Sequence, residues 1–506
     1  MILETLIGFT FVAALAVFLS PDEYAGQLAF GLSLLPVVGS LYMWSQFDAT
    51  GNALVEGGSL AFATQIDWLT VGGYTLQWFV GLDGISLPLI VLSTVLTSLA
   101  ILSAWTPIDV RQSQFYGLML FMEANLIGVF SALDFFVWFV FWEAVLVPMY
   151  FLIGVWGGPR REYAAIKFFV YTNVASLIMF IGFMALVFNL PVDSFGLPAI
   201  AGALRAGELG GFLGLAPDAL ATVAFAAMFF GFAVKVPVVP VHTWLPDAHV
   251  EAPTPASVML AGVLLKMGTY ALLRFNFTMM PDVAQQLAVP IAAIAVLSVI
   301  YGAMLALAQQ DLKRIVAYSS VSSMGYVILG LVAYTEFGIG GATFQMVAHG
   351  LISGLMFMAV GVIYNVTHTR MLGDMSGMAD RMPITTGILI AGAFGYMGLP
   401  LMAGFAAEFF IFQGSFTSTV LPAAPLFTAA AMFGIVIVAG YLLWAIQRTL
   451  FGEFSVETDY EVTRAQFHDT APLAVLLLCT IALGVAPEVF FGMITDAVVP
   501  LLGGGA

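Results

Sequence analysis

Five ionisable residues stand inside long apolar segments of this chain of 506 residues, where charged side chains are rare. They are Glu143 in FWEAVLVPMY, Lys235 in GFAVKVPVVPVHTW, Lys266 in AGVLLKMGTY, His349 in FQMVAHGLISG and Glu408 in the apolar stretch 384 to 415. At the centre of a bilayer a charged side chain costs about 2.5 to 3.5 kcal/mol even on a lenient scale. Carboxyl, amine and imidazole groups exchange protons, so this set indicates a relay that moves protons.

Structural interpretations compete with the relay. Glu143 and Lys235 could form a purely structural buried ion pair, and His349 could be a satisfied core histidine. Isolated structural pairs would need matched partners, whereas two lysines, two glutamates and a histidine spread over five helices do not pair off. The ordinary pKa of a histidine, about 6.5, makes His349 a natural exchange point between stronger groups. Glu123, in LMLFMEANLIG, is a weaker candidate because no motif surrounds it.

The composition places the chain in a membrane. It is 61% hydrophobic and 9% charged, with a mean hydropathy of +1.02, so it cannot hide its apolar surface around one aqueous core. The single cysteine, Cys479, excludes disulfides, iron–sulfur clusters and thiolate zinc sites. A net charge of −16, with no basic patch and no phosphate-binding glycine-rich loop, argues against nucleic acids and nucleotides as ligands.

Apolar runs near the length that crosses a bilayer, about 20 residues, predict an all-α integral membrane protein. No soluble domain interrupts the bundle. The segment 47 to 83 alternates polar and aromatic residues with several glycines, which predicts a small hairpin or loop on the outer face. About fourteen helices are predicted, at 3 to 20, 26 to 46, 84 to 106, 113 to 132, 134 to 154, 165 to 190, 219 to 241, 254 to 276, 285 to 308, 312 to 335, 341 to 366, 384 to 415, 424 to 449 and 470 to 490.

The distribution of Lys and Arg supports this count, because basic residues should gather in the alternate loops that face the cytoplasm. Only Arg205 and Arg274 fall in the opposite loops. An even number of spans then places both termini on the outer side. The first segment lacks the basic start of a signal peptide, so it is expected to remain as a helix. The loops after odd-numbered helices hold ten of the fourteen basic residues, namely Arg111, Arg160, Arg161, Lys167, Lys313, Arg314, Arg370, Arg381, Arg448 and Arg464.

Two predicted helices are interrupted beside a buried charge. Pro237 and Pro240 remove backbone donors next to Lys235 and should break helix 7. The sequence at 398 to 400, Gly-Leu-Pro, should break helix 12 near Glu408. Broken helices five apart predict two inverted repeats, helices 4 to 8 and 9 to 13, because an odd number of helices inverts the second copy. The N-terminal helices, the two repeats and the C-terminal helix would occupy residues 1–112, 113–280, 281–450 and 451–506.

A polar hairpin is predicted between helices 7 and 8. Its histidines and carboxylates superficially suggest a metal site. The surrounding prolines and the expected position at the surface favour a structural turn, or a place of proton uptake, instead. The four polar residues are His242, Asp247, His249 and Glu251.

Four ordered motifs resemble the antiporter-like subunits of respiratory complex I, the proton-pumping NADH:quinone oxidoreductase. They are KVPVVPVHTWLPDAHVEAPTPASVMLAGVLLKMGTYALLR, FWEAVLVPMYFLIG, QQDLKRIVAYSSVSSMGY and AHGLISGLMFM, and the resemblance covers nearly the whole chain. Three related chains exist in that family. The fourteen-helix length, the FWE-x-x-L-V-P-M-Y motif and a glutamate at position 408, where the other two typically carry a lysine, are typical of the M type, also called chain 4.

The resemblance implies a role for each buried charge. In the order of the relay, Glu143 would be the acidic modulator of helix 5, Lys235 the proton-binding lysine of the first half-channel, Lys266 the connection between the halves, His349 the next carrier and Glu408 the terminal carrier toward the outer side. Ser323, in SSVSSMGY, departs from the pattern. Several relatives have a histidine at this position of the relay. In this chain, either the Ser323 hydroxyl and water carry the proton there, or no group does.

The resemblance also implies where the cofactors and partners are. This chain would hold no cofactor, and FMN, iron–sulfur clusters, NADH and quinone would bind to other subunits. Its partners would be the other membrane-arm subunits, including the related antiporter-like chains, together with lipid, protons and water. The implied location is a bacterial inner membrane.

Three other functions stay open from the sequence. The chain could belong to a multisubunit sodium/proton antiporter, which genomic neighbours would reveal. It could be a non-pumping scaffold of the membrane arm, which predicts tolerance of charge-neutral changes at Lys266 and Glu408. The membrane part of a proton-pumping hydrogenase is disfavoured by the close match to the complex I chain.

Overall fold

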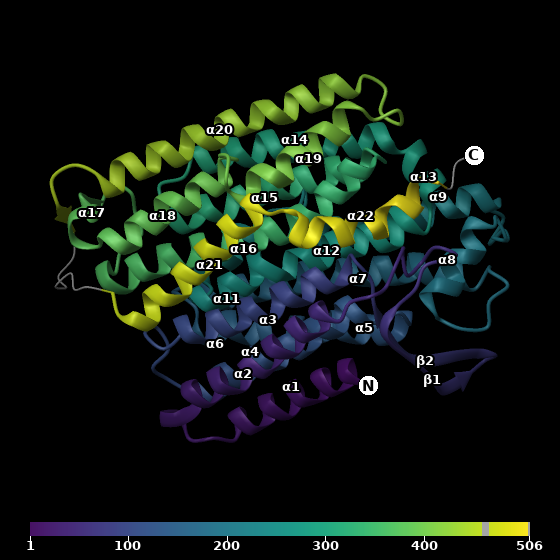
Figure 1. Ribbon diagram of the computed structural model, residues 1–506, viewed down its shortest axis with the longest axis horizontal. Coiled ribbons are helices and arrows are strands. Elements are labelled where there is room, and N and C mark those ends of the chain that lie inside the picture. The colour runs from purple at the N-terminus through teal and green to yellow at the C-terminus, as the bar shows by residue number, and fades with distance from the viewer. Residues whose placement is uncertain (458–464, 504–506) are drawn as a thin grey trace.

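Long helices packed side by side make up almost the whole molecule (Figure 1). The computed structural model describes residues 1–457 and 465–503, so Arg464, one of the basic residues assigned to the cytoplasmic side, lies outside the described residues. Within the described ranges, eleven helices are long and apolar enough to cross a membrane. The prediction of an all-α membrane protein is confirmed.

The remaining spans of the bundle are shorter or more polar. They are α1 (Ile2–Phe18), α4 (Gln112–Ser131) and a broken span made of α18 (Pro383–Tyr396) and α19 (Ala403–Phe416). They run alongside the eleven longer helices in Figure 1. With them, each of the fourteen predicted spans has a counterpart.

The hairpin expected between residues 47 and 83 is present. The strands β1 (Ala61–Val71) and β2 (Tyr74–Leu82) pair antiparallel. Gly72 and Gly73, with φ of 61° and 90°, form the two-residue turn, a left-handed conformation that glycine adopts without a Cβ clash. The hairpin projects at one end of the bundle (Figure 1).

The other elements follow the predicted order, but the sequence did not predict the helices α8, α13 and α22, which lie wholly or mostly outside the predicted spans. The N-terminal part and the first repeat contain α2 (Asp22–Ser45), α3 (Ser86–Ser103), α5 (Phe135–Ala144), α6 (Leu146–Trp156), α7 (Arg161–Val187), α8 (Leu197–Arg205), α9 (Pro217–Lys235), α10 (Trp244–Glu251), α11 (Thr254–Met259) and α12 (Leu265–Ala271). The rest contains α13 (Pro281–Gln286), α14 (Ala288–Leu307), α15 (Leu312–Val332), α16 (Glu336–Thr367), β3 (Met375–Ser376), α17 (Met378–Arg381), α20 (Ala424–Leu450), β4 (Ser455–Val456), α21 (Phe467–Val485) and α22 (Glu488–Leu502).

Both predicted helix breaks are present. The seventh span stops at Lys235 and resumes at Trp244 with α10, on the far side of the prolines. The twelfth stops at Tyr396 and resumes at Ala403, and Gly398 between them has a φ of 63°. Because helix ends leave backbone groups without helical partners, each break supplies polar backbone inside the bundle beside a buried charge.

The eighth span contains two π-helical segments that the sequence does not predict. The segments η1 (Leu260–Leu264) and η2 (Leu272–Thr278) lie on either side of α12, which carries Lys266. A π turn inserts an extra residue into the helix, and such turns collect at functional sites. The whole span is buried among other helices, so tertiary packing holds this unusual winding.

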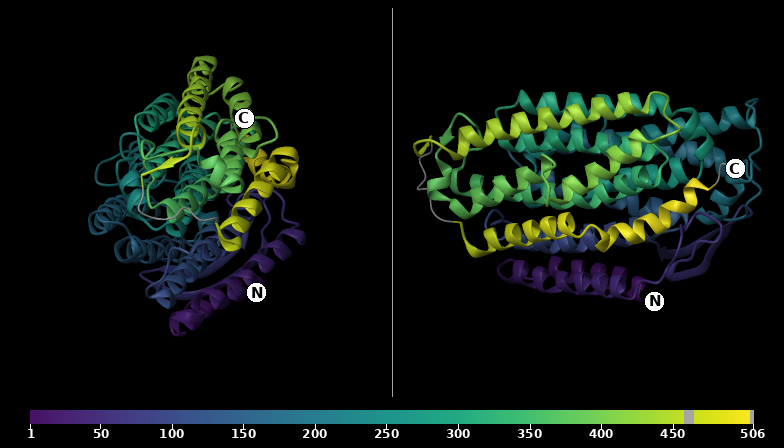
Figure 2. Two further views of the ribbon diagram at one scale, coloured as in Figure 1. Left: turned by 90° about the vertical axis from the view of Figure 1, so that its left-hand side faces the viewer. Right: turned by 45° about the horizontal axis from the view of Figure 1, so that its top comes forward.

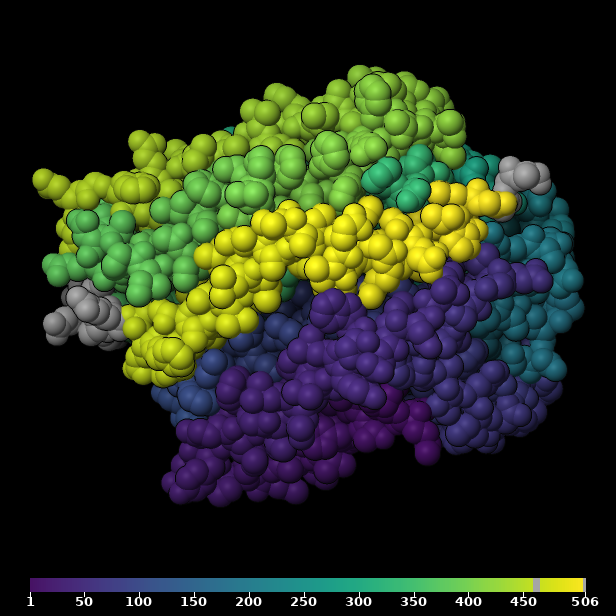
Figure 3. Space-filling view, in the orientation of Figure 1, coloured from purple at the N-terminus to yellow at the C-terminus, as the bar shows by residue number. Residues whose placement is uncertain are grey.

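The first helix begins and the last described helix ends toward the same end of the bundle. The helix α1 begins and α22 finishes toward the end that carries the hairpin, whereas α17 lies at the opposite end (Figure 1, Figure 2). The yellow α21–α22 segment crosses the surface between the purple N-terminal helices and the green helices of the second repeat (Figure 3). It packs against α3, α16 and α18, so it links the N-terminal part to the second repeat.

One basic residue lies deeper than the sequence predicts. Arg274 is not in an outer loop but in η2, and its side chain is only 2% exposed. Its Nη2 atom lies 2.5 Å from Oδ1 of Asp83, a fully buried carboxylate that also accepts hydrogen bonds from the backbone N–H groups of Ala53 and Ile85. Burial alone would raise the pKa of the Asp83 carboxyl. The Arg274 guanidinium instead holds that pKa below its ordinary value. Because 191 residues separate the partners, sequence spacing gives no sign of this pair.

We expect Asp83→Asn to destabilise the protein by about 3 to 5 kcal/mol, because the amide leaves the Arg274 guanidinium buried without its counter-charge. The measurement is the thermal midpoint and the yield of the purified protein in detergent. Asp109→Asn, at an exposed position, is the matched control and should leave both unchanged. Equal midpoints for the two variants would show that the Asp83–Arg274 pair does not hold η2 to the start of α3.

Candidate functional site

Glu143 and Lys235 act on each other electrostatically without touching. Glu143 lies near the end of α5 and Lys235 is the last residue of α9. Among the described residues, no ion pair within 4.0 Å joins them. Asn173 donates to Oε2 of Glu143 at 3.0 Å, and Oε1 makes no hydrogen bond to residues 1–457 or 465–503. The direct structural ion pair that the sequence leaves open is therefore not formed.

The Lys235 ammonium group is buried in an aromatic pocket. Its Nζ atom makes no hydrogen bond to any of the described residues and lies 4.5 Å from the centre of the Trp142 ring. Ser176 accepts a hydrogen bond from the Trp142 indole N–H at 2.9 Å and so fixes that ring. A Cβ at Gly268 would lie only 3.2 Å from Cβ of Lys235, so glycine allows α12 to approach the lysine. A buried amine without a hydrogen-bond partner is costly, and such groups call for a functional explanation.

Lys266 and His349 are in direct contact. The Nζ atom of Lys266 lies 2.6 Å from Nδ1 of His349 and 2.5 Å from the carbonyl oxygen of Ala261. At this distance one of the two nitrogen atoms donates a hydrogen bond to the other. A Cβ at Gly350 would lie 2.8 Å from the carbonyl oxygen of Gly262. These two glycines therefore let α16 and η1 come close enough for the lysine and the histidine to meet.

Glu408 lies beside the break of the twelfth span. Its side chain is buried on α19, and within the described ranges its Oε2 atom makes no hydrogen bond. A Cβ at Gly398 would collide with that oxygen, so the carboxylate points into the break. Tyr326 and Tyr441 are close enough to interact with it electrostatically.

Two tyrosines that the sequence analysis missed lie between His349 and Glu408. The ring of Tyr396 is 5.7 Å from that of His349, and its hydroxyl lies near those of Ser319 and Ser320. Tyr441 is close to both Tyr396 and Glu408. The sequence did not single them out because tyrosine is common in membrane spans. The one sequence feature that marks either residue is the helix break directly after Tyr396.

Ser323 lies near the groups between His349 and Glu408, whereas Glu123 stands apart from them. Ser323 is buried on α15 one turn beyond Ser319, so it lies on the face of that helix that approaches Tyr396. Glu123 is fully buried on α4, and neither of its carboxylate oxygens has a hydrogen-bond partner among the described residues. The described contacts do not connect Glu123 to any of the other charges.

The polar segment between helices 7 and 8 is helical and buried, so its expected surface position is wrong. The helix α10 packs between α7 and α15, which leaves His249 fully buried. Its ring stacks on Phe357 at 4.4 Å, and neither ring nitrogen makes a hydrogen bond in the part of the chain that the structure describes. No group of three metal-ligating side chains was found in the part of the chain that the structure describes.

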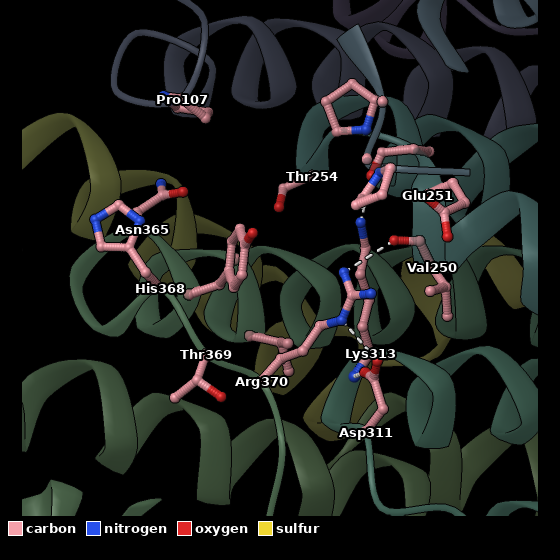
Figure 4. A pocket seen from close by; sticks show the side chains of 18 of the residues that line it. Pro107, Val250, Glu251, Thr254, Asp311, Lys313, Asn365, His368, Thr369 and Arg370 are labelled. Atoms are coloured by element: carbon pink, nitrogen blue, oxygen red, sulfur yellow. Dashed lines mark hydrogen bonds and ion pairs between the residues drawn. The ribbon is translucent and has the colours of Figure 1, made fainter. Parts of the chain in front are cut away.

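Basic side chains from the N-terminal ends of α7 and α15 meet around one carboxylate of α10. Asp247 lies 3.5 Å from Arg160, 2.7 Å from Lys167 and 3.0 Å from Arg314. Nearby, Arg370 pairs with Asp311 at 2.6 Å (Figure 4). The starts of α7 and α15, together with the segment after α16, therefore converge at one end of the bundle, which we call the basic end.

Residues 132–434 match the family described as NADH:quinone oxidoreductase/Mrp antiporter, transmembrane. The chain is 38% identical to NAD(P)H-quinone oxidoreductase chain 4 3 of Trichormus variabilis, over 96% of this chain and 88% of the relative. It is 37% identical to NADH-quinone oxidoreductase subunit M of Rhodobacter capsulatus, over 95% of this chain and 90% of the relative.

Solved structures share the fold along the whole chain. A chain of respiratory complex I from Thermus thermophilus, solved with bound NADH, has a TM-score of 0.84 and 27% identity over 99% of this chain and 100% of that one. A chain of the Mrp complex from Dietzia has the same TM-score at 20% identity, over 99% of this chain and 98% of that one. The second likeness concerns the fold alone.

Proposed function

This chain belongs to the NADH:quinone oxidoreductase/Mrp antiporter family of transmembrane subunits, and from that premise we propose that it is the M-type, proton-translocating membrane subunit of an NADH:quinone oxidoreductase. Relatives named chain 4 and subunit M match it over almost its whole length. The neighbour from respiratory complex I matches end to end. The resemblance seen in the sequence motifs leads to the same assignment.

The observation that carries the proposal is the contact between Lys266 and His349 in the middle of a row of buried polar groups. Lys235 lies on one side of it, against the same helix as Lys266. Tyr396, Tyr441 and Glu408 continue the row on the other side. Proton transfer needs donors and acceptors within hydrogen-bond reach, directly or through a water. A row of this kind supports proton movement along the plane of the membrane.

Electrostatic coupling supplies a driving principle for the first half of the row. A negative Glu143 near Lys235 raises the proton affinity of the lysine, and withdrawal of that charge in a desolvated site lowers it. The absence of a direct ion pair leaves the lysine free to respond to changes at Glu143. The helix breaks beside Lys235 and Glu408 are the elements that could switch between two arrangements.

The proposal assigns the redox chemistry to other subunits. FMN, iron–sulfur clusters, NADH and quinone would act there, and this chain would contribute proton movement alone, next to related antiporter-like chains. The basic end would face the cytoplasm of a bacterial cell and both termini the periplasm, because basic loops are retained on the cytoplasmic side.

The test is Glu143→Gln in the assembled complex. We expect proton pumping and NADH:quinone reductase activity of inverted membrane vesicles to fall at least about tenfold, because the neutral amide can no longer modulate Lys235. Pumping is read from the quenching of an acridine dye, and assembly from a native gel. Glu162→Gln, at an exposed position near the basic end, should leave both activities unchanged. Full pumping by the Glu143 variant would contradict the proposal.

The sodium/proton antiporter is the second candidate, favoured by the fold shared with the Mrp chain. Vesicles that lack respiratory substrates separate the two functions. An antiporter subunit would dissipate a proton gradient when sodium is added, whereas the proposed subunit would move protons only during quinone reduction.

A further inference from the structure

Helix α7 binds two consecutive residues of α5 through two polar side chains that lie three residues apart. The Asn173 amide donates a hydrogen bond to Oε2 of Glu143 at 3.0 Å. The Ser176 hydroxyl accepts one from the indole N–H of Trp142 at 2.9 Å. Residues three apart lie on the same face of a helix, and polar side chains within a span join neighbouring helices by hydrogen bonds. One face of α7 therefore holds both residues of α5 in place.

The fifth span is interrupted directly after Glu143, where the sequence predicts one unbroken helix. The helix α5 ends at Ala144 and α6 begins at Leu146. Pro148 has no N–H group, and in a continuous helix that group would bond to the carbonyl oxygen of Ala144. The backbone beside Glu143 therefore lacks a helical hydrogen bond, so it resists a change of direction less than a continuous helix does.

Glu143 lies between two groups of different charge, the neutral Asn173 amide and the Lys235 ammonium group. In the described part of the chain, Oε2 accepts from the amide, Oε1 has no hydrogen-bond partner, and no ion pair within 4.0 Å joins the carboxylate to the lysine. The charge of Glu143 nevertheless acts on Lys235, whose Nζ atom lies over the Trp142 ring. The structure therefore shows the arrangement in which α7 binds the carboxylate and the tryptophan ring supports the ammonium group.

We propose that Asn173 is a positioning residue that holds the Glu143 carboxylate away from Lys235, and that breaking this hydrogen bond lets the carboxylate pair with the lysine. The inference rests on the proposed function and adds to it the group that separates the two charges. Because the amide is neutral, Glu143 keeps its charge while it is held. Release at the helix break brings the carboxylate to the ammonium group, which then binds its proton more tightly. Return of the carboxylate to Asn173 lowers the proton affinity of the lysine again, and the proton leaves along the row toward Lys266.

Asn173→Leu in the assembled complex is the direct test. Leucine keeps the branched shape of the asparagine side chain and removes its hydrogen-bond donor. We expect pumping and coupled quinone reductase activity of inverted vesicles to fall at least about tenfold, because Glu143 then stays paired with Lys235. Pumping is read from dye quenching and assembly from a native gel. Asn173→Gln keeps an amide donor for the carboxylate and should retain most of both activities.

Val174→Leu is the matched control, because this residue follows Asn173 on α7 and its side chain is exposed. It should leave pumping and assembly unchanged. Undiminished pumping by Asn173→Leu would overturn the proposal, and so would equal losses in the leucine and glutamine variants. If Glu143→Gln still lowered pumping in either case, the proposed function would stand and only the role of Asn173 would be wrong.

A double variant separates a positioning residue from a structural one. If Asn173 acts through Glu143, Asn173→Leu causes no further loss once Glu143→Gln has removed the charge, because residues that act as one unit have non-additive effects. We therefore expect the double variant to pump as fast as Glu143→Gln alone and to give a normal band on the native gel. A structural role would multiply the two losses or prevent assembly, and either result would contradict the proposal.

Discussion

Replacing Lys235 with methionine is expected to abolish proton pumping and coupled quinone reductase activity, a loss of about a hundredfold or more, while the complex assembles normally. Methionine fills a similar volume beside Trp142 but cannot carry a proton. The lysine makes no hydrogen bond and no ion pair within 4.0 Å in the described part of the chain, so the substitution removes no partner from another group. The measurements are reductase activity, dye quenching in inverted vesicles and a native gel.

The same variant should be at least as stable as the parent protein. Burying an amine without a partner disfavours the folded state, and replacing a buried charge with a well-packed apolar side chain is often neutral or stabilising. A structural role predicts the opposite, with lower stability and lost assembly. Lost activity together with an unchanged or raised thermal midpoint therefore identifies a functional charge.

Lys235→Arg sharpens this test. Arginine keeps the positive charge and can still lie over the Trp142 ring, but its pKa is too high for it to release a proton. We therefore expect low pumping from this variant as well. A fully active arginine variant would show that Lys235 supplies charge alone and does not cycle between protonation states.

Asp83 and Lys235 illustrate two opposite uses of buried charge in one chain. Asp83 is held by Arg274 and by backbone N–H groups, and its neutralisation should weaken the fold. Lys235 has no such partners, and its neutralisation should spare the fold and stop proton movement. The sequence alone marks both aspartate and lysine as charges in an apolar chain. The structure distinguishes the two residues by the hydrogen-bond and ion-pair partners that each side chain has.

The positions of the spans and breaks could be predicted because their signals are local. Runs of apolar residues, the prolines after Lys235 and the Gly-Leu-Pro sequence at 398 to 400 each act on the backbone of their own segment. The hairpin was predictable for the same reason, since Gly72 and Gly73 determine its turn. Boundaries such as the start of α22 were not, because an apolar run does not record where one helix ends and the next begins.

The features that the sequence did not reveal depend on contacts between distant segments. The π turns beside Lys266 are held by packing on all sides, and nothing in the letters LAGVL or LLRFNFT requires them. His249 is buried because α10 packs between α7 and α15, which a local polar pattern cannot show. The proximity of Tyr396 to His349 joins two spans. The individual charges of the candidate site could thus be found, but not their partners.

The contact between Lys266 and His349 predicts the second large effect, a loss of pumping in either single variant that the double variant does not deepen. We expect Lys266→Met and His349→Gln each to lower pumping about a hundredfold. If the two groups pass the same proton in series, removing either one interrupts the path, and removing both can do no more. Effects of residues that act as one unit are strongly non-additive.

A parallel arrangement predicts a different result. If protons reached Glu408 by two routes, one through each residue, the single variants would keep part of the activity and the double variant would lose the remainder. Tyr396→Phe extends the comparison along the row, because it removes only the hydroxyl between His349 and Glu408 and leaves the ring in place. In a series path, this variant combined with His349→Gln should be no slower than His349→Gln alone. A measurably slower double variant would place Tyr396 on a separate path and would divide the row into two.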